Sequence, residues 1–298
     1  MDSGRVSPLQ PFDVIATRNI VGEGILWNPH RGELWWTDIE SGRLHCYDWS
    51  RRALEVFATP ERIGSFGLVA GSRQLITAFA SGVALYDVRA GKVDWMVRPP
   101  EVVPGIRFND GRVDRQGRFW CGTMSESAQR PATGCLYAMG RNGRWQCHLE
   151  GVRISNGLCM SVDGSKLYFA DSPTHVIQEY ELLEPEGRLG KRRDFARTAA
   201  NASPDGAAID AEGCLWSAQW GSGCVVRYTP DGKIERTLAV PTRQPTCVCF
   251  AGPDLDVLCV TTAKENLDAA TLRAEPDAGA VFLYRTGVRG LPESEYRR

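Results

Sequence analysis

The stretch LWWTDI, at residues 34–39, is the first of six similar hydrophobic runs in this chain of 298 residues. The other five runs are LITAFA, FWCGTM, LYFADS, LWSAQW and LCVTTA, beginning at Leu75, Phe119, Leu167, Leu215 and Leu258. Successive runs start 41, 44, 48, 48 and 43 residues apart. Self-similarity at a period of about 40–50 residues is typical of propellers and related repeat folds.

Each run predicts one strand of a repeated unit. A second apolar stretch follows most runs, as in GRLHCYDW, GVALYDV and GCLYAM, and turn sequences such as Asn142-Gly143 and Glu186-Gly187 close the units. No helical stripe of useful length competes with this pattern. We therefore predict an all-β fold, a six-bladed β-propeller with about four antiparallel strands per blade. The alternative is a sandwich whose strands are similar by coincidence.

The ends of the chain are expected to close the ring. We predict that residues 12–17 pair with residues 280–284, because closure removes exposed strand edges. The chain then forms a single domain, residues 1–298, with its core at about 12–286. A flexible N-terminus and a loosely held tail after Leu291 are expected outside that core.

Composition excludes several classes of function. A formal net charge of −1 and the lack of a Lys/Arg block argue against nucleic-acid binding. No apolar run approaches 18 residues, so we expect no membrane span. Residues 1–11 lack the apolar region of a signal peptide. We expect a soluble, cytoplasmic protein that is a monomer.

The cysteines and histidines do not indicate a thiol or imidazole site. None of the ten cysteines forms a C-x-x-C pair, and we expect reduced thiols that pack as small apolar groups. The four histidines, His30, His45, His148 and His175, are not clustered. A zinc site of the Cys/His type and a Ser-His-Asp triad therefore have little support.

Acidic and amide side chains offer a better candidate site. Four segments, VGEG, RFNDG, SNG and SPDG, contain Glu23, Asn109, Asn156 and Asp205, which lie 11, 10, 11 and 10 residues before their hydrophobic runs. One such segment alone indicates only a turn. In a radially repeated fold, however, equal positions lie at equal heights around the axis, so we expect all four side chains at one end of the channel. Two carboxylates and amide oxygens suit a hard divalent cation.

Longer motifs carry a resemblance to a known family. The segments GEG-x-x-W, RFNDGRVDRQGRFWCGTMSE, ISNGLCMSVDG, PDGAAIDAEGCLW and FAGPDLDVLCVTTA resemble the senescence marker protein/gluconolactonase family, which includes regucalcin. The resemblance extends from about Val21 to Tyr284. It implies a six-bladed propeller that holds one divalent metal ion in its channel and hydrolyses sugar lactones.

The resemblance also implies roles for individual residues. The family's metal ligands correspond to Glu23, Asn156 and Asp205, and Asp205 is also implied to take the proton of the attacking water as the catalytic base. The family's substrate-binding residues correspond to Arg107, Asn109 and Glu126. Where the family often has Pro, this chain has Ile25, which removes no ligand. The loop at residues 127–133 is expected to cover the site and to tune substrate choice.

The sequence thus predicts metal-dependent hydrolysis of an aldonic-acid lactone, a pentono- or hexono-lactone. The metal, whether Ca²⁺, Mg²⁺, Mn²⁺, Zn²⁺ or Fe²⁺, would act as a Lewis acid on the lactone carbonyl, with Arg107 helping to stabilise the oxyanion. One alternative is a hydrolase of other esters, such as organophosphates, which the unclustered histidines do not support. Another is a calcium-binding regulatory protein, which would have no use for hydroxyl-binding residues.

Some side chains have competing interpretations. Arg107 and Glu126 could form a structural ion pair instead of binding substrate. Trp220 and Lys264 follow hydrophobic runs and are weaker candidates; we expect Trp220 to pack in a blade and Lys264 to be solvated. The tryptophans at 35, 36 and 120 are expected in the core.

Overall fold

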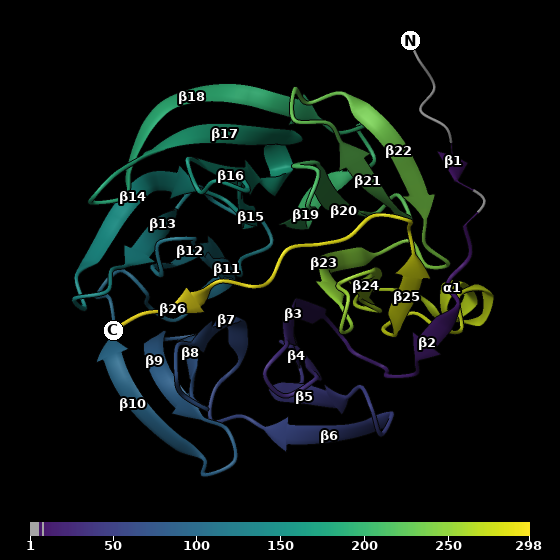
Figure 1. The fold of residues 1–298 in the computed structure, drawn as a ribbon, viewed down its shortest axis with the longest axis horizontal. Coiled ribbons are helices and arrows are strands. Elements are labelled where there is room, and N and C mark those ends of the chain that lie inside the picture. The colour runs from purple at the N-terminus through teal and green to yellow at the C-terminus, as the bar shows by residue number, and fades with distance from the viewer. Residues whose placement is uncertain (1–5, 8) are drawn as a thin grey trace.

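The computed structural model describes residues 6–7 and 9–298, and within them the strands form six sheets arranged in a ring (Figure 1). In each sheet, one of the six hydrophobic runs forms the strand that pairs with the inner strand β3, β7, β11, β15, β19 or β23. The predicted six-bladed propeller is therefore confirmed. No helix in these two ranges is long and apolar enough to cross a lipid bilayer.

Three blades are continuous in sequence from the channel outward. Blade 1 contains β3 (Gly22–Asn28), β4 (Glu33–Asp38), β5 (Arg43–Asp48) and β6 (Ala53–Ala58). Blade 3 contains β11 (Ile106–Val113), β12 (Phe119–Ser125), β13 (Gly134–Met139) and β14 (Trp145–Val152). Blade 4 contains β15 (Ser155–Met160), β16 (Lys166–Asp171), β17 (Val176–Leu183) and β18 (Arg188–Arg197), with a 3₁₀ turn η1 (Ser172–Thr174) after β16.

The other three blades receive strands from the chain ends. Blade 2 contains β7 (Ile63–Val69), β8 (Leu75–Phe79), β9 (Gly82–Asp87), β10 (Lys92–Val97) and β26 (Glu295–Tyr296). Blade 5 contains β19 (Ser203–Ile209), β20 (Leu215–Trp220), β21 (Cys224–Tyr228), β22 (Ile234–Ala239) and β1 (Val6–Ser7). Blade 6 contains β23 (Pro245–Ala251), β24 (Val257–Thr262), β25 (Val281–Arg285) and β2 (Asp13–Ile15), with helix α1 (Ala269–Ala274) before β25.

Blade 6 closes the ring as predicted. Strand β2 pairs antiparallel with β25, so that Asp13 lies opposite Leu283 and Ile15 lies opposite Val281. The predicted pairing of residues 12–17 with residues 280–284 is therefore confirmed. An N-terminal strand in the last blade leaves no gap between blades 6 and 1.

In the described residues, six large apolar clusters each pack between two neighbouring blades, and a seventh, small cluster contains Val21, Ile39 and Ala263. Trp36, Trp120 and Trp216 are fully buried, and Trp35 is 6% exposed, which confirms that the tryptophans predicted for the core pack there. All ten cysteines are free thiols, and seven of them are buried. The core therefore lies between the blades and leaves the channel for polar side chains.

The prediction of a loosely held tail after Leu291 is wrong. The tail segment, which we define as residues 291–297, crosses the propeller face where the inner strands end, and β26 pairs in parallel with Leu68 and Val69 of β7 (Figure 1). Tyr296 is 1% exposed and packs between blades 2 and 3. The apolar side chains of Leu291 and Tyr296 pack inward and hold the segment. Two such residues are too few to form a hydrophobic pattern in the sequence. The flexible N-terminus was expected over about the first dozen residues. Residues 1–5 and 8 lie outside the described residues, but β1 pairs with β22, and the Phe12 amide donates to the Leu283 carbonyl oxygen at 2.9 Å.

Candidate functional site

The side chains marked by the common offset lie where the inner strands depart from regular pairing. The register of each inner strand shifts after Glu23 in β3, after Phe108 in β11, after Asn156 in β15 and after Pro204 in β19. A β-bulge re-aims the side chains beside it. Glu23, Asn109, Asn156 and Asp205 all line one cavity of about 450 Å³, as do Arg107 and Glu126. The structure thus brings together all six predicted site residues.

Two carboxyl groups form the floor of this cavity. Glu23 and Asp205 are 8% and 6% exposed, and a side-chain hydrogen bond joins them. Burial, followed by the charge of Asp110, raises the pKa of Glu23 to about 8. Burial, followed by the charge of Glu23, raises the pKa of Asp205 well above its ordinary value. The charge of Arg107 lowers the pKa of Glu23 but only partly offsets these effects.

Asp110 is a third buried acid, and the sequence analysis did not single it out. Its Oδ1 accepts a hydrogen bond from the Gly111 amide at 2.8 Å, and its Oδ2 accepts one from the Leu158 amide at 2.8 Å. These bonds fix Asp110 between blades 3 and 4, and its charge raises the pKa of both Glu23 and Asp205. Its position beside Asn109 in the RFNDG segment was the available signal.

A chain of amides fixes the wall of the cavity. Arg107 Nη1 donates to Asn109 Oδ1 at 2.6 Å, and Asn109 Nδ2 donates to Asn156 Oδ1 at 2.9 Å. Asn156 Nδ2 then donates to Ser172 Oγ at 2.8 Å, which itself donates to the Pro204 carbonyl oxygen. These bonds assign the amide of Asn156 its orientation and leave one lone pair of its Oδ1 free for a ligand.

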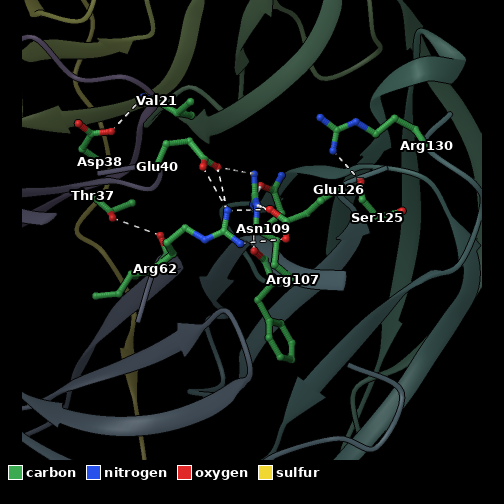
Figure 2. Close-up of polar contacts among 12 residues, drawn as sticks. Val21, Thr37, Asp38, Glu40, Arg62, Arg107, Asn109, Ser125, Glu126 and Arg130 are labelled. Carbon is green, nitrogen blue, oxygen red and sulfur yellow. Dashed lines mark hydrogen bonds and ion pairs between the residues drawn. The ribbon is translucent and has the colours of Figure 1, made fainter. Parts of the chain in front are cut away.

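The rim of the cavity contains charges that the motifs did not mark. Arg62 donates to both carboxylate oxygens of Glu126, at 2.7 and 2.9 Å, and its Nη1 lies 3.1 Å from Glu40 Oε2 (Figure 2). Arg107 Nε is 3.6 Å from Glu126 Oε1, too long for a hydrogen bond. Glu126 is thus held mainly by Arg62, and the predicted alternative of an Arg107–Glu126 ion pair describes only a weak contact.

Four rim residues follow the second strand of their blades. Of these, only Glu126 was predicted as a site residue, and Trp220 was a weaker candidate. Glu40, Glu126, Trp220 and Glu265 line the cavity from positions at or just after the ends of β4, β12, β20 and β24. Antiparallel pairing places the end of a second strand beside the start of the inner strand, as where Trp220 lies opposite Ser203. Trp220 therefore reaches the cavity as well as packing against Val21, and the same reasoning would have found Glu40 and Glu265.

The donor set fits a hard divalent cation. In residues 6–7 and 9–298, no three His, Cys, Asp or Glu side chains are grouped as a metal site, so a cation here would need an amide ligand in addition to acids. Glu23 and Asp205 would supply two charges, and Asn156 Oδ1 would supply a neutral oxygen. The burial of two neighbouring carboxyl groups, only partly offset by Arg107, is the observation that favours this fit.

Stability without metal should fall as the pH rises. The pKa of Glu23 in the folded protein is about 8, above its ordinary value of 4.5, so its stabilising protonated form is complete below pH 4.5 and lost towards pH 8. We expect the melting temperature in EDTA to be lower at pH 8 than at pH 5, and added Ca²⁺ or Zn²⁺ to restore it at pH 8. Glu23→Gln should flatten this difference; an equal pH dependence in wild type and Glu23→Gln would contradict the assignment.

Comparisons with known proteins identify relatives of this chain. Residues 21–264 match the SMP-30/gluconolactonase/LRE-like region. A 6-deoxy-6-sulfogluconolactonase of Pseudomonas putida is 38% identical over 283 residues, which cover 94% of this chain and 96% of that protein. An L-arabinolactonase of Azospirillum brasilense is 36% identical over 289 residues, covering 94% and 93% of the two chains.

A solved structure extends the similarity to three dimensions. The calcium-binding protein regucalcin from Agrobacterium tumefaciens matches with a TM-score of 0.92 at 32% identity, over 98% of this chain and 99% of that chain. Its similarity, like that of the two lactonases, covers more than nine-tenths of this chain. The chain belongs to the SMP-30/gluconolactonase/LRE-like family.

Proposed function

We propose that this protein hydrolyses a sugar lactone to the open-chain acid with the help of one divalent cation held by Glu23, Asn156 and Asp205. The observation that carries the proposal is the pair of buried carboxyl groups, Glu23 and Asp205, in a cavity of about 450 Å³ that amide and charged side chains also line. The relatives named for 6-deoxy-6-sulfogluconolactone and L-arabinolactone support an aldonic lactone as the substrate class.

The reaction adds water across the ester bond of the ring. A cation bound here would supply Lewis acidity for the lactone carbonyl and would favour ionisation of water. Asp205 accepts a proton from the attacking water as its oxygen adds to the carbonyl carbon. The ring C–O bond then breaks, and the ring oxygen takes up a proton and becomes a hydroxyl group of the product acid.

Residues of blade 3 bind and orient the substrate. Arg107 is 7% exposed, and its guanidinium lies beside the amide chain, where it can stabilise negative charge on the carbonyl oxygen. Asn109 and Glu126 bind sugar hydroxyls, since a site built to hydrogen-bond hydroxyls rejects analogues that lack them. Arg130 of the loop at residues 127–133 also lines the cavity, in agreement with a role of this loop in substrate choice.

The test is lactone hydrolysis by metal-stripped protein after addition of each of Ca²⁺, Mg²⁺, Mn²⁺, Zn²⁺ and Fe²⁺. The panel contains pentono- and hexono-lactones, including a sulfonated hexonolactone, and acid release is corrected for spontaneous ring opening. We expect one ion to restore turnover with a clear lactone preference. Metal binding without turnover above background would instead favour a calcium-binding regulatory protein. The proposal also includes a cytoplasmic monomer, which light scattering and cell fractionation test.

A further inference from the structure

Arg62 joins three blades at the rim of the cavity. It lies directly before β7 in blade 2, and its backbone carbonyl accepts a hydrogen bond from Ala80 at 2.8 Å. Its guanidinium binds Glu126 of blade 3 through two parallel bonds and reaches both carboxylate oxygens of Glu40 in blade 1, at 3.1 and 3.3 Å (Figure 2). One side chain therefore fixes two acids from different blades.

This cluster is poorly explained as a stabilising ion pair. The side chains of Arg62, Glu40 and Glu126 are 31%, 27% and 30% exposed, and ion pairs at such exposure add little to stability. Blade 2 supplies neither a candidate ligand nor an amide to the cavity floor, yet it places this arginine between two carboxylates that line the cavity. Its position points to a role in binding.

The geometry leaves acceptor capacity facing the cavity. An ionised carboxylate has about four lone-pair sites, and Arg62 uses two on Glu126, one on each oxygen. Arg62 also holds the pKa of Glu126 below its ordinary value, with Arg107 and Arg130 adding to the effect, which keeps Glu126 an acceptor only. A hydroxyl group is the natural donor to such an acceptor, and an acid held in place loses little freedom on binding it.

We propose that Arg62 is a positioning residue that holds Glu40 and Glu126 as a pair of hydroxyl acceptors, so that the site selects lactones with several free hydroxyl groups. The inference rests on the proposed lactonase function. It adds Glu40 to the substrate-binding residues and gives blade 2 a part in specificity. Arg62 touches neither the lactone carbonyl nor the attacking water, so its loss should affect binding far more than the chemical step.

The test compares two six-membered lactones, D-glucono-1,5-lactone and the hydroxyl-free δ-valerolactone. We expect Arg62→Gln to raise KM for gluconolactone by about 10-fold to 100-fold, the effect of losing one or two hydrogen bonds to a charged group, with kcat changed by less than about 3-fold. For valerolactone, kcat/KM should stay unchanged. Arg62→Lys, which keeps the charge but not the bidentate geometry, should restore part of the loss.

Arg89→Gln is the matched control. Arg89 binds Glu55 through two parallel bonds at 3.1 and 2.7 Å, also between blades 2 and 1, but on the outer side away from the cavity. It should leave both lactones unaffected. Equal losses for both lactones in Arg62→Gln, or no loss for either, would overturn the inference.

A binding measurement separates this inference from the proposed function. D-Glucitol has the hydroxyl groups of gluconolactone but no ester, and its binding to intact, metal-loaded protein is followed by calorimetry. If wild type hydrolyses no member of the pentono- and hexono-lactone panel above background, the proposed lactonase function fails. Weaker glucitol binding by Arg62→Gln than by Arg89→Gln would still support the positioning role, whereas equal affinities, or no binding to wild type, would refute it.

Discussion

Asp205→Ala is expected to lower kcat/KM for lactone hydrolysis by about 10³-fold or more while the propeller stays folded. Asp205 has two proposed roles, because it would both hold the cation and accept the proton of the attacking water. Its carboxyl group is 6% exposed and lies beside that of Glu23, which would itself hold the cation. Initial rates of acid release at saturating metal, with circular dichroism as the check on folding, measure the effect.

Removing the charge of Asp205 should lower activity but should not lower the stability of the metal-free protein. Burial and the charges of Glu23 and Asp110 all raise the pKa of Asp205, so its ionised form is unfavourable in the metal-free protein. Asp205→Asn should therefore melt at or above the wild-type temperature in EDTA, as expected where a functional site is kept at a cost in stability. Asp231→Asn, an exposed acid in the same blade, is the control. Near-wild-type turnover in Asp205→Ala would rule out the mechanism.

Asp210→Ala should lower the free energy of unfolding by about 3 kcal/mol, which corresponds to roughly 5 °C in melting temperature. Asp210 is fully buried, and its Oδ2 accepts bonds from Trp216 Nε1 and Arg227 Nε, both at 2.8 Å. Its Oδ1 accepts two backbone amides, from Glu212 and Cys214. The substitution would leave a buried cation and three buried N–H groups without this partner.

Glu212→Ala tests whether the effect is specific to the buried acid. Glu212 also binds Arg227, at 2.6 Å, but its side chain is 63% exposed. An exposed partner of this kind should contribute no more than about 1 kcal/mol. Urea denaturation of both variants compares them directly, and equal losses of stability would show that the buried contacts of Asp210 do not matter.

The same arrangement recurs in blade 3 and shows why the fold could be predicted. The segments DRQGRFW and DAEGCLW place Asp114 six residues before Trp120 and Asp210 six residues before Trp216. Asp114 Oδ2 likewise accepts from Trp120 Nε1 at 2.8 Å. A repeated local structure must repeat its turn, its cap and its core residue at fixed spacing. The periodicity of the sequence therefore predicted most of the fold.

The floor of the site was predictable for the same reason. Glu23, Asn109, Asn156 and Asp205 sit at equivalent bulges, so a matched offset in the sequence becomes a shared height in the channel. The roles of these residues came from the family resemblance. Periodicity alone does not distinguish a metal ligand from a hydroxyl-binding amide.

Contacts between different blades could not be read from the repeats. Arg62 lies in a blade where Gly64 occupies the bulge, and a Cβ there would overlap the carbonyl group of Phe108. Because Gly64 has no side chain, β11 can approach blade 2 at this position. Blade 2 contributes Arg62 instead. Whether Arg62 contacts Glu126 depends on the distances between three blades and on side-chain rotamers, which the repeat period of a single blade does not determine.

The tail segment determines how molecules pass through this protein. Glu293 binds Arg112 at 2.8 Å across the far end of the channel, and only small spaces of about 30 and 10 Å³ lie beside residues 291–294. The central hole of the ring is thus a blind pocket rather than a passage. We therefore expect a lactone to enter, and the acid made from it to leave, on the side of the cavity that Glu40 and Glu126 line. The product acid must leave before the next lactone can bind, so accumulated product is expected to compete directly with substrate.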